Sequence, residues 1–288
     1  DKQILCKEAL SVYKSYKTQK NYSEAYVQWE KACAVCPPQV QESLYTNGST
    51  FIKSEIKEAK AAGDLERKAV LVDSLMWVYD MRMELFPSTK KKPNNRCHIL
   101  GRKASDYYSF NKDSVQVAFE MFKESVDCLG AKSSASVLSG YYVTSFYAMK
   151  NVNKIDKEAG TAKKIKMLTD YLMLMDYCNE ALANAEVAEN SRNIKGYTKA
   201  KENIEKTFVA IAKCEEMVKV LQASIDADPE NFDLQKKVLR ILTNRECTEN
   251  DLFLPIATSV YEFEPSHEAA FAIGMGYAKQ SQLSESFK

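Results

Sequence analysis

The chain has 288 residues, of which 45% are apolar and 27% charged, so it is able to bury a sizeable core and is not a disordered chain. Its 40 basic and 39 acidic residues nearly cancel, whereas a nucleic-acid-binding protein usually carries a basic excess. Nine Gly and seven Pro are few for this length, which favours long helices over a β-sandwich with a turn about every 8–12 positions. No apolar stretch reaches the roughly 18 residues that a membrane-spanning helix needs.

The first predicted elements are two antiparallel helices between Cys6 and Pro37. Tyr16 is the aromatic residue of the first helix, Asn21-Tyr22 forms the turn, and Ala25 is the small residue at the closest approach. Trp29 follows one helical turn later, and Pro37 ends the unit. This spacing resembles the tetratricopeptide repeat, a helical hairpin of about 34 residues.

Weaker forms of the same pattern continue along the chain. Predicted helix pairs cover 40–62 with 65–86, 98–111 with 114–129, 133–150 with 156–187, and 233–244 with 249–263. The stretch 192–226 is predicted to be helical and to stop at Asp228-Pro229, with its register on the repeat left open. From His267 to Lys288 the match strengthens again, and Gly274 within this helix predicts a neighbouring helix packed directly on the backbone.

The resemblance implies an all-α fold, a right-handed α-solenoid of stacked antiparallel helix pairs in one domain over residues 1–288. The predicted repeats are 6–39, 40–88, 98–131, 133–190, 192–231, 232–266 and an incomplete 267–288. One hairpin is unable to bury its apolar face alone, so neighbouring hairpins stack. Most aromatic side chains are therefore predicted to be core, among them Tyr13, Trp29, Trp77, Tyr79, Phe122 and Tyr141.

The two ends of the sequence carry expectations of their own. Residue 1 is Asp rather than an initiator Met, which admits a leader peptide removed before it. Lys288 falls inside the second helix of a repeat, so we expect either a longer native chain or a short last helix.

The eight cysteines suggest disulfides, because the helical hairpin brings its two ends together. Cys6 and Cys36 lie at the same end of the first hairpin, and Cys214 and Cys247 occupy corresponding turns of neighbouring repeats; we expect both pairs to be bonded. Cys97 and Cys128 form a third candidate pair, which leaves Cys33 and Cys178 as buried free thiols. Disulfides predict an exported protein, and the alternative is eight reduced cysteines in the cytoplasm.

No catalytic, metal or cofactor motif emerges from the sequence. Its two histidines, His98 and His267, are far apart, and Cys97-His98 are neighbours whose side chains diverge on a helix. The Cys33–Cys36 CxxC lies at a helix C-terminus, where the helix dipole does not favour a thiolate. We therefore expect no enzymatic activity and no cofactor.

In tetratricopeptide proteins the first helix of each repeat lines a binding groove, and that pattern is transferable position by position. It places Lys7, Leu10, Lys14 and Lys17 in the groove of the first repeat, with Lys103, Tyr107 and Phe110 in the third pair. In the last repeat the groove residues are Glu268, Phe271, Met275 and Lys279. The lysines suggest capture of a peptide carboxylate, although Leu10 stands where such grooves carry Asn; the alternative is a solvated lysine-rich face.

Two segments also resemble an exported tetratricopeptide family of Bacteroidetes: Cys6–Pro37, and the run from Cys214 through Pro229, Leu239, Leu242 and Cys247 to Leu252-Phe253 and Pro265. That resemblance implies a periplasmic or cell-envelope location and a scaffold role without a defined activity.

Three functions follow from these expectations. The leading one is a scaffold that binds a partner protein or peptide, without nucleic acid or membrane insertion. The second is a structural part of an envelope assembly that self-associates through its C-terminal end. The third is a carbohydrate or small-ligand binder that uses groove aromatics.

Overall fold

The computed structural model describes residues 2–90, 92–211 and 213–286, with side chains described as far as Lys279. Over these ranges the chain is built of α-helices and two short 3-10 turns, and it contains no strand. The predicted all-α helical-repeat class is confirmed.

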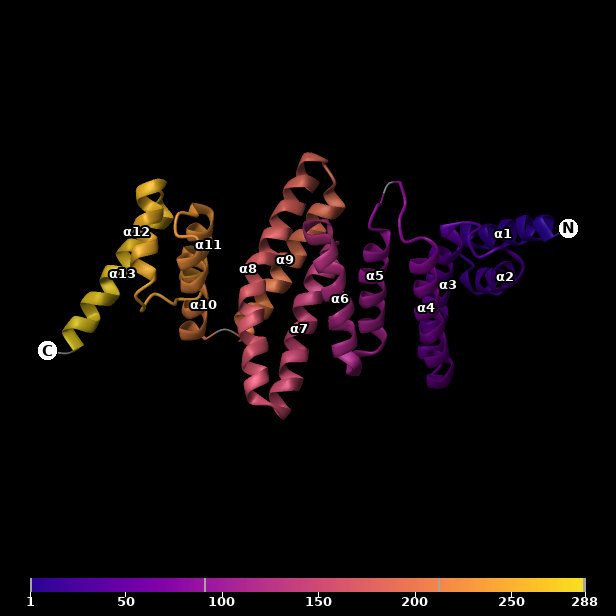
Figure 1. Ribbon diagram of the computed structural model, residues 1–288, viewed down its shortest axis with the longest axis horizontal. Coiled ribbons are helices and arrows are strands. Elements are labelled where there is room, and N and C mark those ends of the chain that lie inside the picture. Colours follow the sequence, from indigo (N-terminus) through magenta and orange to yellow (C-terminus); the bar gives the residue numbers. More distant parts are fainter. Residues whose placement is uncertain (1, 91, 212, 287–288) are drawn as a thin grey trace. The chain divides into compact units, whose positions relative to one another are not determined.

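The helices follow the predicted pairs closely (Figure 1). They are α1 Lys2–Thr18, α2 Tyr22–Val35, α3 Glu42–Ala61, α4 Leu65–Leu85, α5 Asn95–Phe110, α6 Val115–Leu129, α7 Ala135–Ile155, α8 Lys157–Val187, α9 Ser191–Ile211, α10 Cys214–Ala227, α11 Phe232–Asn244, α12 Phe253–Phe263 and α13 His267–Ser286. The stretch predicted as helical over 192–226 consists of two helices, α9 and α10.

Local signals in the sequence start several of these helices. The side chains of Asn21, Asp64 and Asn231 accept hydrogen bonds from the backbone N–H of Glu24, Arg67 and Leu234, at 3.3, 2.9 and 3.0 Å. Each bond satisfies one of the free N–H groups of a helix N-terminus. The caps therefore set the beginnings of α2, α4 and α11.

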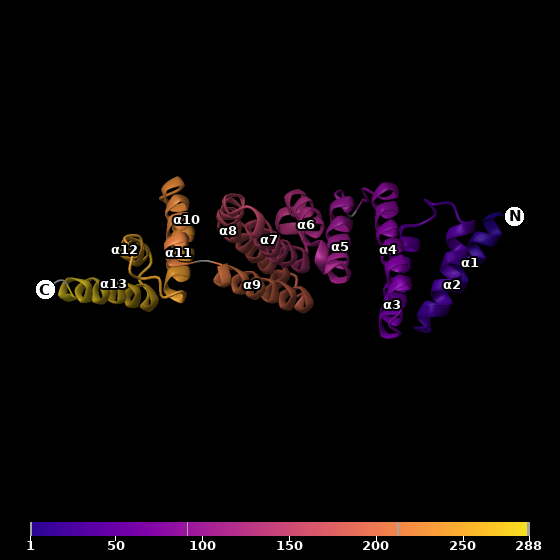
Figure 2. The same ribbon diagram turned by 90° about the horizontal axis from the view of Figure 1, so that it is seen from below.

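The chain forms two compact units, which are described separately. The first comprises Asp1–Ala148 and Asp176–Lys201, and the second Met149–Met175 and Glu202–Lys288. Within the first unit, α1 packs on α2, α3 on α4 and α5 on α6, and α2–α3 and α4–α5 contacts join these pairs (Figures 1 and 2). In the second unit α12 packs on α11 and α13. The single domain expected over 1–288 stays a prediction.

The indole of Trp29 packs between α2 and α3 in the core of the first unit. Trp29 of α2 is buried, and its Nε1 donates a hydrogen bond to the backbone oxygen of Leu44 at 2.8 Å. A Cβ at Gly48 of α3 would overlap this ring, so the glycine permits the close approach of α2 and α3. The same relation recurs between Gly140 of α7 and Phe122 of α6.

Two expectations about packing are wrong. Trp77 is 49% exposed rather than core, because the buried stripe of α4 runs through Leu75, Val78, Tyr79 and Arg82 and leaves Trp77 on the outer side. Gly274 has no described helix packed against it, since no described atom would lie within 4 Å of a Cβ at this position. The other aromatics predicted as core are buried, namely Tyr13, Trp29, Tyr79, Phe122 and Tyr141.

Three disulfides join the cysteine pairs that were proposed from the sequence. They join Cys6 to Cys36, Cys97 to Cys128 and Cys214 to Cys247, with Cα–Cα distances of 4.8, 6.3 and 5.5 Å. Cys33 is a half-buried free thiol and Cys178 a buried one. Burial raises the pKa of Cys33 to about 12 and that of Cys178 to about 11, so both stay protonated at neutral pH.

A polar cluster joins α3, α4 and α5. The Glu42 carboxylate accepts hydrogen bonds from Arg82 Nε and Nη2, at 2.9 and 2.7 Å, and from Asn95 Nδ2 at 2.9 Å. Asn95 also donates to the backbone oxygen of Phe86 at 2.9 Å. Partial burial raises the pKa of Glu42, but the hydrogen bonds from Asn95 and Arg82 and the Arg82 and Lys92 charges outweigh it and hold the pKa below its usual value.

This cluster predicts acid sensitivity of the first unit. Because the folded-state pKa of Glu42 is lowered, its stabilisation is fully present above the unfolded pKa of about 4.3 and is lost as pH falls through the folded value. We expect Glu42→Gln to lower the free energy of unfolding at pH 7 and the gap from wild type to shrink below about pH 4. Urea titrations of both proteins from pH 7 to pH 3 measure this, and a gap independent of pH would contradict it.

Candidate functional site

The lysines predicted to line the first groove are largely occupied by neighbouring side chains. Lys17 Nζ donates to Asn47 Oδ1 at 2.6 Å, and Lys14 Nζ donates to Gln41 Oε1 at 3.4 Å. Lys7 is exposed, and Leu10, expected in the groove, belongs to the core instead. The α1 lysines thus mainly tie the first helix pair to α3 and the segment before it.

The remaining predicted groove residues lie on α5 of the first unit and α13 of the second. Lys103 of α5 forms an ion pair with Asp80 of α4 at 2.5 Å, and Tyr107 of the same helix is half-buried. Phe271 lies on α13, in the second unit, and its side chain is 65% exposed. The prediction that the groove residues of α1, α5 and α13 together bind a peptide therefore stays a prediction.

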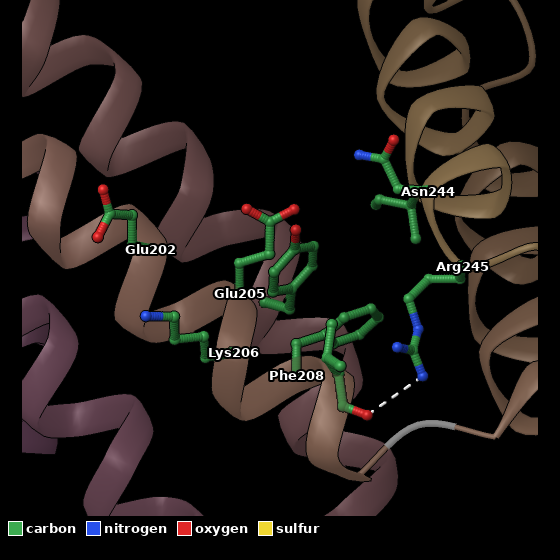
Figure 3. Close-up of a pocket in the computed structure, with 9 residues that line it drawn as sticks. Glu202, Glu205, Lys206, Phe208, Asn244 and Arg245 are labelled. Atoms are coloured by element: carbon green, nitrogen blue, oxygen red, sulfur yellow. Dashed lines mark hydrogen bonds between the residues drawn. The ribbon is translucent and has the colours of Figure 1, made fainter.

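A hollow of about 430 Å³ lies in the second unit between α9 and α11 (Figure 3). Figure 3 shows Glu202, Glu205 and Lys206 on one wall, with Asn244 and Arg245 facing them from the other. The full lining is Tyr171, Glu202, Glu205, Lys206, Phe208, Val209, Ile241, Asn244 and Arg245.

Two stacked rings form the apolar base of this first hollow. The centroids of Tyr171 and Phe208 lie 3.9 Å apart with an interplanar angle of 20°, and both side chains are buried. Burial raises the pKa of Tyr171 to about 12, with the nearby Glu205 charge adding to it, so the phenol stays neutral. Arg245 Nη2 donates to the backbone oxygen of Val209 at 3.2 Å and so spans one side of the hollow. The hollow therefore has an aromatic base and a rim that carries both acidic residues, Glu202 and Glu205, and basic residues, Lys206 and Arg245.

A second hollow, of about 530 Å³, lies on the other side of α11, toward α13. It is lined by Lys236, Lys237, Leu239, Arg240, Thr243, Asn244, Val260, Ser266, Glu268 and Ala269. Its basic side chains outnumber its one carboxylate, although Lys236 is paired with Glu264 at 2.8 Å. Asn244 lines both hollows, so α11 stands between them.

The α11 ridge, defined as Lys237, Arg240 and Asn244, runs along this helix at spacings of three and four residues. Residues so spaced share one face of an α-helix. Opposite this face, Val238, Leu239 and Leu242 are buried. The ridge was missed from the sequence because groove positions were transferred only to the first, third and last pairs; its spacing in 233–244 was the available signal.

An aromatic pair flanks the second hollow. Phe232 and Phe263 have centroids 3.9 Å apart, and Lys236 Nζ lies 5.4 Å from the Phe232 centroid. This arrangement holds Lys236 at the edge of the hollow through a cation–π contact and its ion pair with Glu264. Lys237 and Arg240 are the ridge cations that line this hollow.

Two arrangements of the described residues bear on catalysis: the adjacent Cys97 and His98, and groups of possible metal ligands. Cys97 is bonded to Cys128, so the adjacent Cys97 and His98 do not form a thiol–imidazole pair. Over the described part of the chain, no group of three or more His, Cys, Asp or Glu side chains is placed to hold a metal ion. Within that part, no helix is both long and apolar enough to cross a bilayer.

Comparison with known proteins finds a likeness among solved structures and none among family models or curated sequences. No protein-family model matches the chain. No curated protein matches it either. Among solved structures it is similar to the TPR domain of P58(IPK), with 15% sequence identity over 96% of this chain and 99% of that chain and a TM-score of 0.22. A TM-score of that size means that the two chains do not superpose as wholes, so the function proposed below rests on this chain's own geometry.

Proposed function

We propose that this protein is a non-enzymatic interaction scaffold whose second unit binds an extended segment of a partner protein across α9, α11 and α13. The observation that carries the proposal is the pair of hollows on the two sides of α11, which share Asn244. Together they offer two sites that adjoin at Asn244 rather than a single closed cavity. Such an arrangement suits a chain-like ligand better than a compact one.

The chemistry of the two hollows supports a peptide. The first has an aromatic base in Tyr171 and Phe208 that accommodates an apolar side chain. The second presents Lys237 and Arg240 with the side chains of Thr243, Asn244 and Ser266. Amide and hydroxyl groups pair with a peptide backbone, and the cations pair with its acidic side chains.

The test is capture of a partner by crosslinking from an extract of the protein's own cells. We expect the chain to retain a defined protein in near-stoichiometric amount. Arg240→Glu with Asn244→Ala should abolish that retention, since these side chains lie on the surface and form no packed core. Lys157→Glu, an exposed charge reversal on α8, is the matched control and should leave it intact.

A second set of variants separates this site from the one first predicted. If retention is lost on reversing Lys7, Lys14 and Lys17 to Glu and not with the α11 variant, the binding site lies on α1 and our assignment to α11 is wrong. Recovery of no protein other than the chain itself would contradict the scaffold function.

We further propose that the protein works outside the cytoplasm, in the periplasm or cell envelope, in line with the Bacteroidetes family that its segments resemble. Three disulfides support an oxidising compartment. Mass mapping of the unreduced protein from its native cells should find Cys6, Cys36, Cys97, Cys128, Cys214 and Cys247 oxidised. Eight free thiols would contradict export.

A further inference from the structure

Helix α4 of the first unit carries a stripe of exposed side chains along one side. The α4 stripe consists of Glu66, Val70, Asp73, Trp77, Asp80 and Glu84, which follow one another at alternating spacings of four and three residues. Side chains so spaced share one side of an α-helix, and all six are exposed. The opposite side of α4 holds the buried Leu71, Leu75 and Tyr79, and the helix packs on α3 and α5.

Trp77 gives the stripe an apolar centre. It is 49% exposed, and Val70, seven residues earlier on the same side, is 62% exposed. The other tryptophan of the chain, Trp29, is buried. An exposed tryptophan offers a large apolar area to a partner, and tryptophan is among the residue types that contribute most to the affinity of protein interfaces.

The charges of the stripe are all negative. Its four charged positions, 66, 73, 80 and 84, carry carboxylates, although the chain as a whole has a net charge of +1. The basic residues of α4 are Arg67, Lys68 and Arg82, which lie on other sides of the helix. The two arginines form ion pairs with carboxylates of α3, and Lys103 of α5 pairs with Asp80 at 2.5 Å.

Spacing and charge together indicate the kind of partner. Alternating steps of three and four residues keep a stripe on one side of a helix over many turns, as in helices that pack side by side at a shallow angle. From Glu66 to Glu84 the stripe extends about 27 Å at the rise of an α-helix, which is about five turns of a second helix. Its carboxylates attract Lys and Arg side chains, and an indole ring also binds cations on its face.

We propose that the α4 stripe binds a basic helix of a partner protein that lies along α4. The Lys or Arg side chains of that helix contact the carboxylates, and its apolar side chains cover Val70 and Trp77. The stripe belongs to the first unit, whereas the residues that line the two hollows beside α11 belong to the second. This is therefore a second binding surface, and it does not depend on the function proposed for α11.

A synthetic peptide tests the proposal. The probe is a helix of three heptads with leucine at the first and lysine at the fourth position of each heptad, and its control has glutamate in place of lysine. We expect saturable binding of the lysine peptide, with a blue shift of the emission from Trp77, because Trp29 is already buried. Binding should weaken as salt is raised from about 50 to about 500 mM, since salt screens exposed charges. The glutamate peptide should not bind.

Variants of the stripe identify it as the binding site. Asp73→Asn with Glu84→Gln removes two of its charges, and Trp77→Ala removes the ring. We expect each variant to bind a fluorescently labelled lysine peptide about tenfold more weakly than wild type, measured by anisotropy, with an unchanged far-UV spectrum. Glu180→Gln with Glu186→Gln makes the same change of charge at exposed positions of α8, and this matched control should bind like wild type.

The same titration separates the stripe from the site beside α11. Arg240→Glu with Asn244→Ala should bind the lysine peptide as wild type does. Equal binding of the two peptides, no saturable binding, or stripe variants that bind no more weakly than the α8 control would each overturn the proposal. Self-association of the wild-type chain that Trp77→Ala abolishes would also overturn it, because the stripe would then bind a second copy.

Discussion

Replacing Gly48 by alanine should lower the free energy of unfolding of the first unit by about 1–3 kcal/mol, the usual effect of overfilling a packed core. The added methyl group would overlap the Trp29 indole, and the hydrogen bond from Nε1 to the Leu44 oxygen prevents the ring from moving away without loss. The expected loss is notable because Gly→Ala in a helix ordinarily stabilises. Urea unfolding followed by far-UV circular dichroism measures it.

The matched control is Gly274→Ala, which makes the same chemical change in another helix. Among the described residues nothing lies within 4 Å of the new methyl group, so the change should leave stability unaltered or raise it by up to about 1 kcal/mol. If both substitutions stabilised the protein, the close approach of α2 and α3 at Gly48 would be wrong.

Removing the first disulfide should have the largest effect of any change proposed for the first helix pair. Cys6 and Cys36 are separated by 30 residues, and closing a loop of that size stabilises by about 3–4 kcal/mol in the chain-entropy model. Both cysteines are also buried, so the double variant Cys6→Ala with Cys36→Ala loses packing as well. Denaturant titration of the oxidised proteins should show a corresponding shift in midpoint.

Cys33→Ala provides the comparison for that experiment. It removes a half-buried sulfur three residues before Cys36 without breaking a crosslink, and we expect a much smaller loss. Equal losses for the single and the double variant would mean that the disulfide contributes little beyond packing.

Most of the helix order could be predicted from the sequence, because the signals are local. Asn21, Ala25, Trp29 and Pro37 fall at fixed positions in one hairpin, and the remaining helices agree with predicted ranges to within a few residues. The sequence between α9 and α10 carries no Gly or Pro, so 192–226 was predicted as one helical stretch and the break within it was missed. Trp77 was wrongly predicted to be buried. Helix α4 has apolar residues on more than one side, and its packing against neighbouring helices determines which side is buried.

The candidate site was less accessible from the sequence, because it depends on which helices face one another. The α1 lysines looked free in the sequence, yet Gln41 and Asn47 reach two of them from a loop and from α3. The two hollows combine Tyr171 of α8 with residues of α9, α11, α12 and α13, far apart in the chain. The periodicity of apolar residues within one helix does not indicate which other helices will face it.

The placement of the two tryptophans has a consequence for how unfolding is observed. Trp29 and Trp77 both belong to the first unit, one buried and one half-exposed, and the chain has no other tryptophan. Intrinsic fluorescence excited at the indole band therefore reports on the first unit alone, while helical ellipticity reports on both. Coincident transitions by the two signals would show that the units melt as one cooperative whole, and a late loss of ellipticity would show that the second unit outlasts the first.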